Sequence, residues 1–128
     1  MRVTARDAGD VVVLTLEGRL VLEDVETELR TALDGLIEQG RVRLVLNMQD
    51  VTYVDSAGIG FLVSKYVSVH RRGGNIVLVR VAPRVAHVLE ITRLARIFEV
   101  FASDEDAVLA LEHPPAHTPS GRFTVTSG

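Results

Sequence analysis

Asp55 and Ser56 follow a buried-strand pattern at 42–46 and precede a helical pattern, so they lie where a strand passes into a helix. A polar turn from Asn47 to Val54 is expected to deliver this pair to the helix N-terminus. A helix N-terminus offers free N–H groups and a partial positive charge, and both accommodate a phosphate. A serine at this place can change its charge while the fold persists, which suits a binding switch better than a catalytic centre.

A nucleophilic role for Ser56 would require a positioned base and an oxyanion hole. No histidine lies within ten residues of Ser56, and the Gly-x-Ser-x-Gly pattern of hydrolases is absent around it. A histidine distant in the sequence remains open as a partner in the folded chain, and the four histidines are His70, His87, His113 and His117. An enzyme acting through Ser56 therefore ranks last among the possible functions.

The neighbours of Ser56 have structural explanations as well as functional ones. Asp55 is either a partner contact that helps to orient the hydroxyl or a helix cap worth about 1 kcal/mol, and these roles are compatible. Ser56 itself has the alternative of being an unregulated cap. Gly58 and Gly60 lack the other glycines and the lysine of a nucleotide-binding loop, which favours close helix-to-sheet packing and predicts no bound cofactor.

Phe61 is the first candidate for an exposed apolar contact with a partner, because helical spacing leaves the direction of its side chain open. Thr52 and Tyr53 are ordinary turn residues that would border any surface centred on Ser56. The expected partner surface thus comprises Thr52, Tyr53, Asp55, Ser56, Ala57, Gly58 and Phe61.

The composition is that of one domain with its own core, at 128 residues and 47% apolar content. The absence of cysteine excludes disulfides and thiolate metal sites and is compatible with the cytoplasm. A formal charge of −3, with two Tyr, four Phe and no Trp, argues against a nucleic-acid partner. Apolar runs fall short of a signal peptide or membrane span, so we expect a soluble cytoplasmic protein without membrane insertion.

Apolar periodicity predicts an α/β fold in which helices alternate with buried strands after an N-terminal hairpin. The hairpin joins a short strand near Val3 to a strand over Val11 to Leu16 through a turn at Gly9 and Asp10. Further strands are expected at 42–47, 75–80 and 97–100, and helices at 22–37, 56–72, 83–89 and 103–111. These elements predict a mixed sheet of four to five strands with about four packed helices.

The composition changes after Glu112, where three prolines fall within six residues. This change predicts a domain over 1–112 and a flexible tail over 113–128, although weak pairing of 122–126 with a sheet edge stays open. His113 and His117 have the spacing of helical metal ligands, but the intervening prolines exclude a helix there. No metal site is expected.

The stretch from Asp50 to Leu62 (DVTYVDSAGIGFL), with the helix after it and the passage from Gly73 into strand 76–79, resembles STAS domains. Among these it resembles the bacterial anti-sigma factor antagonists, and the likeness covers roughly residues 3–111. The resemblance implies a sheet of four or five strands covered by helices. It also implies that Ser56 matches the serine that a partner kinase phosphorylates.

In that family the unmodified antagonist binds an anti-sigma factor, which is itself the serine kinase, and so frees the sigma factor. Phosphorylation of the serine breaks the complex, and a PPM-type phosphatase restores it. A phosphate adds between one and two negative charges, here beside Asp55, so the resemblance implies release by repulsion and desolvation. The implied protein is a regulator without enzymatic activity.

Two other readings of the resemblance remain. STAS domains also serve as accessory subunits of lipid-type ABC transporters, which need no phosphorylation cycle, and a stress-signalling scaffold subunit is a third reading. The antagonist reading requires a partner with a histidine-kinase-like ATPase fold and sensitivity to charge at Ser56. The transporter reading requires neither.

Overall fold

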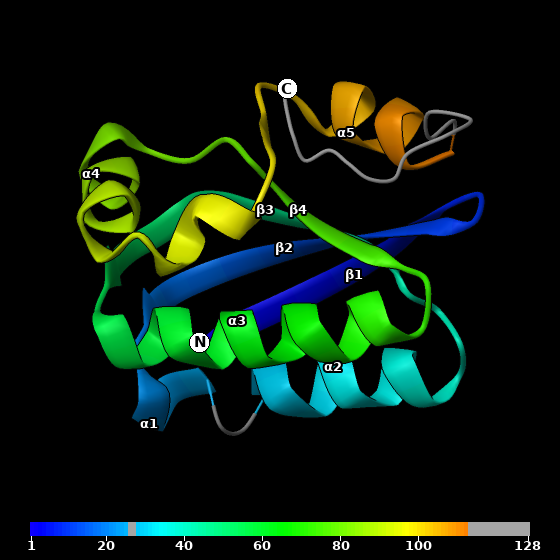
Figure 1. The fold of residues 1–128 in the computed structure, drawn as a ribbon, viewed down its shortest axis with the longest axis horizontal. Coiled ribbons are helices and arrows are strands. Elements are labelled where there is room, and N and C mark those ends of the chain that lie inside the picture. Colours follow the sequence, from blue (N-terminus) through cyan, green and yellow to red (C-terminus); the bar gives the residue numbers. More distant parts are fainter. Residues whose placement is uncertain (26–27, 113–128) are drawn as a thin grey trace.

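A five-stranded mixed sheet forms the centre of the computed structural model, which describes residues 1–25 and 28–112. The strands lie side by side in chain order, with β1 antiparallel to β2 and the others parallel (Figure 1). Their bounds are β1 Arg2–Ala8, β2 Val11–Leu20, β3 Arg43–Val54, β4 Asn75–Val79 and β5 Val100–Phe101. The mixed α/β fold and the N-terminal hairpin are confirmed.

Helices cover both faces of this sheet. Figure 1 shows α2 (Glu28–Glu38) and α3 (Ser56–Arg71) together on one face and α5 (Asp104–Glu112) on the other. A single turn, α1 (Leu22–Val25), precedes α2, while α4 (Pro83–Thr92) and the 3-10 turn η1 (Leu94–Ile97) lie between β4 and β5 in the chain. Within the described ranges, no helix combines the length and the apolarity that crossing a membrane requires.

Side-chain alternation along the strands divides the core into two clusters. On the side of α2 and α3, leucines of the inner strands such as Leu44 and Leu46 pack against Ile59 and Leu62 of α3. On the other side, Val11, Val13, Val45, Val77 and Val79 pack against Ala107 and Leu111 of α5. Both faces of the parallel strands are therefore buried, as the near-continuous apolar runs of β2, β3 and β4 predict.

The expected polar turn from Asn47 to Val54 is wrong, because β3 continues through this stretch and pairs with β2 as far as Val54. Met48, Val51 and Val54 are buried while the polar residues between them are mostly exposed. Register shifts between β2 and β3 break the strict alternation here. The buried positions therefore fall three residues apart and do not resemble an ordinary strand.

Two further boundaries differ from expectation. The helix expected over 22–37 is divided into α1 and α2, and 26–27 lie outside the described residues. The strand expected over 97–100 is present but begins later, at Val100, because Arg93, in the left-handed conformation, ends α4 and the 3-10 turn follows. Only Val100 and Phe101 remain to pair with β4. The expected tail over 113–128, with its histidines, also lies outside the described part of the chain.

Tyr66 of α3 connects the helical layer to the segment before β5. Its ring stacks on His70 at 5.4 Å between centroids and meets Phe98 edge-on at 5.3 Å. Burial, and secondly the negative charge of Glu99, raise the pKa of the Tyr66 hydroxyl above its ordinary value. The folded protein therefore holds this proton more tightly than the unfolded chain does.

Because of this difference, the free energy of unfolding should depend on pH in the alkaline range. A group whose pKa is raised on folding contributes its full stabilisation below the unfolded value, about 10 for tyrosine, and loses it as pH rises through the folded value. The free energy of unfolding of the wild type should fall more steeply above pH ~10 than that of Tyr66→Phe, which keeps both ring contacts. Urea denaturation of both proteins at several alkaline pH values checks this, and parallel profiles would refute it.

Candidate functional site

Ser56 is the first residue of α3, and its side chain is exposed. Asp55 precedes it as the N-cap, with φ −126° and ψ 175°, and the Asp55 Oδ1 accepts a hydrogen bond from the Gly58 N–H at 2.9 Å. The capping role expected for Asp55 is thus present in the structure. Because Asp55 supplies the cap, the Ser56 hydroxyl is not engaged in holding the helix start.

Gly58 fixes how closely α3 approaches the end of β2. A Cβ added at Gly58 would collide with the backbone carbonyl of Leu20, and the Asp55 N–H donates to the same carbonyl oxygen at 3.4 Å. The expectation of close packing at this glycine is confirmed, and no side chain fits between the two backbones. At Gly60 the same expectation is wrong, because a Cβ there would meet nothing within 4 Å.

Exposed residues of β3 and α3 surround Ser56. Thr52, Tyr53 and Ala57 are exposed, and Tyr53 exposes 51% of its surface although it is aromatic. Leu22 was missed by the sequence reasoning: it begins α1, which packs on α3, and it is 42% exposed. The parallel strands β2 and β3 end at the same edge of the sheet, so the elements after them gather there. A mixed apolar and hydroxyl surface results.

Phe61 does not join this surface. Its side chain is 6% exposed and belongs to the core cluster between the sheet and the α2–α3 layer. The guanidinium of Arg30 lies 5.1 Å and the ammonium of Lys65 5.5 Å from its ring centroid. The expectation of an exposed Phe61 is corrected, because two cationic side chains cover the ring that helical spacing left undecided. We therefore place no partner contact on this ring.

Within the described residues, the surroundings of Ser56 do not supply the base that a nucleophilic serine requires. No hydrogen bond joins the Ser56 hydroxyl to a base among residues 1–25 and 28–112. His70 is fourteen residues along α3, about 21 Å at 1.5 Å per residue, and stacks on Tyr66. His87 is on α4. His113 and His117 lie outside the described residues, so only their distance from Ser56 along the sequence is known.

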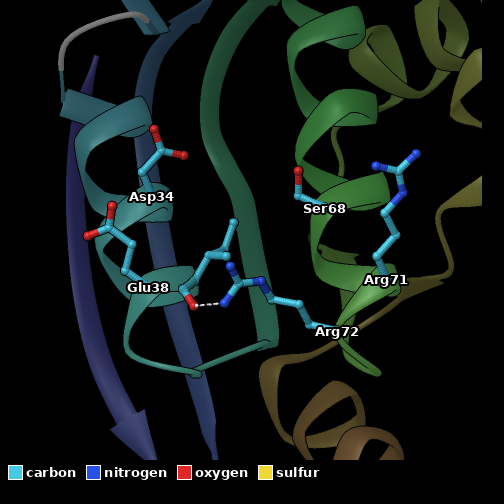
Figure 2. A pocket seen from close by; sticks show the side chains of 6 residues that line it. Asp34, Glu38, Ser68, Arg71 and Arg72 are labelled. Atoms are coloured by element: carbon cyan, nitrogen blue, oxygen red, sulfur yellow. Dashed lines mark hydrogen bonds between the residues drawn. The ribbon is translucent and has the colours of Figure 1, made fainter.

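Two shallow hollows mark the described surface. One of them, about 300 Å³, lies between α2 and α3. Figure 2 shows Asp34 and Glu38 on one side of it and Ser68, Arg71 and Arg72 on the other. Arg72 donates to the carbonyl of Ile37 at 3.0 Å across its end. This hollow lies along the C-terminal half of α3, far from Ser56. The other, about 350 Å³, lies between Thr52 of β3 and the start of α4 and is continuous with the exposed surface at Thr52.

Removal of the Asp55 cap should destabilise the protein measurably. Asp55→Ala leaves the Gly58 N–H without its acceptor, which is expected to cost about 1 kcal/mol of unfolding free energy. Asp50→Ala is the matched control, because Asp50 is an exposed carboxylate on β3, the strand that leads to Asp55, and has no hydrogen bond or ion pair in the described chain. It should change stability by less than ~0.5 kcal/mol. Thermal denaturation compares the two. Equal losses would mean that the cap contributes nothing specific.

Comparison with known proteins identifies the family of this fold. The sequence pattern of the STAS domain matches residues 2–107. The chain belongs to the STAS domain family. Among the relatives of this STAS chain, the anti-sigma-B factor antagonist of Bacillus subtilis is 35% identical over 80 residues, which are 62% of this chain and 72% of that protein.

A second relative of this STAS domain is the anti-sigma F factor antagonist of Paenibacillus polymyxa, 26% identical over 105 residues that cover 80% of this chain and 87% of the other. The crystal structure of TM1081 from Thermotoga maritima superposes with a TM-score of 0.80 at 25% identity, over 87% of this chain and 95% of that one. Sequence and structure comparisons thus agree on one family over nearly the whole described chain.

Proposed function

We propose that this STAS protein is an anti-sigma factor antagonist switched at Ser56. Its unphosphorylated form binds an anti-sigma factor with serine kinase activity and releases the sigma factor, and phosphorylation of Ser56 breaks that complex. A PPM-type phosphatase resets the switch. The protein acts by binding in the cytoplasm and is not an enzyme. Relatives that carry the name of anti-sigma factor antagonists support the general role.

One observation carries the assignment of Ser56. Its hydroxyl is exposed at the first position of α3, while Asp55 alone satisfies the cap at the Gly58 N–H. A phosphate can therefore be added without removing a hydrogen bond on which the helix depends, and the helix N-terminus favours its charge. Tyr53, Thr52 and Ala57, exposed around it, are the proposed partner contacts, together with Asp55. The expectation of a contact at Gly58 is corrected, because this residue is buried against the Leu20 backbone and its N–H is bound by Asp55.

The mechanism of release follows from charge. An interface that fits a neutral hydroxyl must desolvate two nearby negative groups once Ser56 carries a phosphate beside Asp55. Repulsion and desolvation both oppose the complex, whereas the free protein keeps the phosphate in water. The switch thus changes affinity and leaves the fold in place.

Affinity capture from native lysate tests this proposal. Ser56→Ala and Ser56→Asp baits, matched for folding by circular dichroism, should differ: the first retains a kinase-fold anti-sigma factor and the second loses it. Retention of the same transporter ATPase by both baits would instead support an accessory subunit of a lipid-type ABC transporter. Equal retention of one scaffold assembly would support the stress-signalling reading. Retention of the transporter ATPase, equal retention of a scaffold assembly, or the absence of a kinase on both baits would each contradict the proposal that this protein is an anti-sigma factor antagonist.

A further inference from the structure

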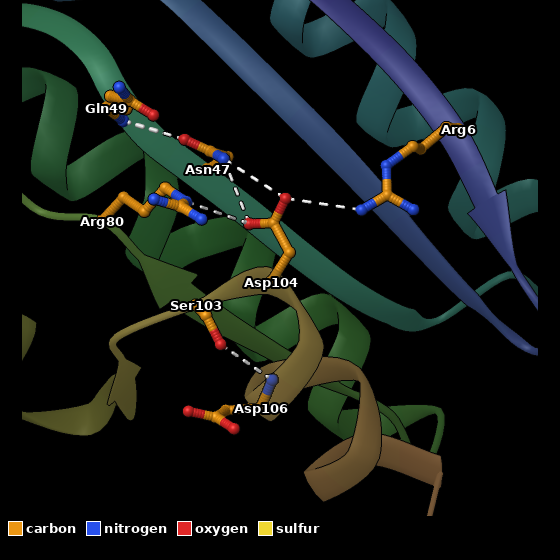
Figure 3. A network of polar contacts seen from close by, with 7 residues as sticks. All are labelled: Arg6, Asn47, Gln49, Arg80, Ser103, Asp104 and Asp106. Atoms are coloured by element: carbon orange, nitrogen blue, oxygen red, sulfur yellow. Dashed lines mark hydrogen bonds and ion pairs between the residues drawn. The ribbon is translucent and has the colours of Figure 1, made fainter.

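Among the residues whose burial the structure describes (1–23, 28–93 and 96–112), Asn47 is the only polar residue that is buried, at 7% exposure. Figure 3 shows how it is held: its Nδ2 donates to the two carboxylate oxygens of Asp104 at 3.0 and 3.4 Å, and its Oδ1 accepts from the Gln49 N–H at 3.0 Å. Asp104 is the first residue of α5. A buried amide therefore links a helix on one face of the sheet to the backbone of β3.

The Asp104 carboxylate is also held by charge. Arg6 of β1 donates to it at 3.4 Å, and Arg80, which follows β4, lies 3.9 Å away (Figure 3). Strands β1 and β3 and the end of β4 thus meet at a single carboxylate, whose side chain is 16% exposed. Charge-assisted hydrogen bonds in such a setting are stronger than exposed ones, so the start of α5 is anchored to the sheet at this point.

The Gln49 N–H that Asn47 satisfies lies in an irregular part of β3. Between the pairs Thr15↔Asn47 and Glu17↔Asp50, and again between Gly18↔Val51 and Arg19↔Tyr53, β3 advances one residue more than β2. Each extra residue leaves backbone groups outside the ladder. Side chains satisfy them in both places: Asn47 accepts from Gln49, and Thr52 Oγ1 donates to the Gly18 carbonyl at 3.3 Å.

These two irregularities decide which residue of α3 faces Leu20. The strand needs both extra residues for Gly58, which has no Cβ, to lie against the Leu20 carbonyl. A slip of one residue, about 3.3 Å of strand, would move Ala57 or Ile59 toward that place, and both carry a Cβ. The position of Asp55 and Ser56 thus depends on a register that Asn47 helps to fix.

We propose that Asn47 and Asp104 are positioning residues for the Ser56 site, and that their contact couples the docking of α5 to the presentation of Ser56. With α5 docked, β3 keeps its irregular register and α3 begins at the capped Asp55. Loss of the contact loosens Gln49 and, further along the strand, the cap at Gly58. Its regulatory use rests on the proposed function, since a partner that binds the Ser56 surface would then bind the docked form more tightly.

Amide hydrogen exchange followed by NMR tests the coupling on the full chain without any partner. Asp104→Ala removes the contact, and Ser103→Ala is the matched control because it removes only the α5 cap, the hydrogen bond from the Asp106 N–H at 3.1 Å. Asp104→Ala should speed exchange at Gln49 and Gly58 by about tenfold or more, while Ser103→Ala should change these two amides by less than about twofold. Unchanged exchange at Gly58 in Asp104→Ala, or equal acceleration by both variants, overturns the proposal.

A polarity swap keeps the proposal testable if Asp104→Ala does not fold. Asn47→Asp places two carboxylates face to face, whereas the double variant Asn47→Asp with Asp104→Asn lets the new amide at 104 donate to the new carboxylate, which still accepts from Gln49. The double variant should return exchange at Gly58 to within about threefold of the wild type. A double variant no better than Asn47→Asp alone overturns the coupling. Because no partner takes part, either result leaves the capture experiment to judge the proposed function independently.

Discussion

Ser56→Asp is expected to weaken binding of the anti-sigma factor several-hundredfold, a loss of about 3 to 4 kcal/mol, while Ser56→Ala binds nearly as the wild type does. The added carboxylate lies beside Asp55, so an interface that covers both must desolvate two negative charges. The fold should not suffer, because a negative charge in the first turn of a helix stabilises it by about 0.3–1 kcal/mol. Calorimetric titration of the captured partner with each variant measures the effect.

Ser68→Asp is the matched control for this titration. It introduces the same charge on the same helix, but twelve residues and about 18 Å from Ser56, near Arg71 and Arg72. Its affinity should stay within about threefold of the wild type. A comparable loss at both positions would show a general effect of charge, and unchanged affinity in Ser56→Asp would remove Ser56 from the interface.

Gly58→Ala is expected to destabilise the protein by about 3 kcal/mol, at the upper end of the range for overpacked positions. The new Cβ would collide with the Leu20 carbonyl, which belongs to backbone held in the sheet and cannot rotate away as a side chain can. Relief requires α3 to move off β2, which also displaces the capped start of the helix. Urea denaturation measures the loss, and partner binding should fall with it.

Gly60→Ala provides the internal comparison for this prediction. The position lies in the same helix, two residues further on, and a Cβ there has open space. Alanine is the better helix former, so this variant should be neutral or stabilise the protein by up to about 1 kcal/mol. If Gly58→Ala and Gly60→Ala have similar stabilities, the close approach of α3 to Leu20 is not a constraint on the fold.

Local sequence patterns predicted most of the fold because the signals lie within single elements. The Gly9–Asp10 hairpin, the buried strands and the beginning of α3 at Ser56 all follow from spacing within about ten residues. The stretch from Met48 to Val54 escaped this reasoning for a physical reason. Two extra residues in β3 move the buried positions from a period of two to a period of three, so the pattern no longer indicates a strand.

The sequence predicted only those features of the candidate site that depend on residues close to one another in the chain. Asp55 as a cap and Gly58 as a close contact follow from residue type and position at a helix start. The burial of Phe61 depends on α2, whose Arg30 lies over the ring, and no helical spacing within α3 reveals that neighbour. Asn47 and Asp104 are 57 residues apart, and their contact depends on how α5 docks on the sheet.

Site-resolved phosphorylation shows whether Ser56 is the switch residue. The wild-type chain is incubated with ATP and the purified anti-sigma factor retained by the Ser56→Ala bait, and phosphopeptides are then assigned by mass spectrometry. A switch at Ser56 requires phosphate on Ser56, none on Ser64 or Ser68 of the same helix, and none on the Ser56→Ala chain. Incorporation at an equal rate into Ser56→Ala, or a wild-type chain that takes up no phosphate at Ser56, would contradict it.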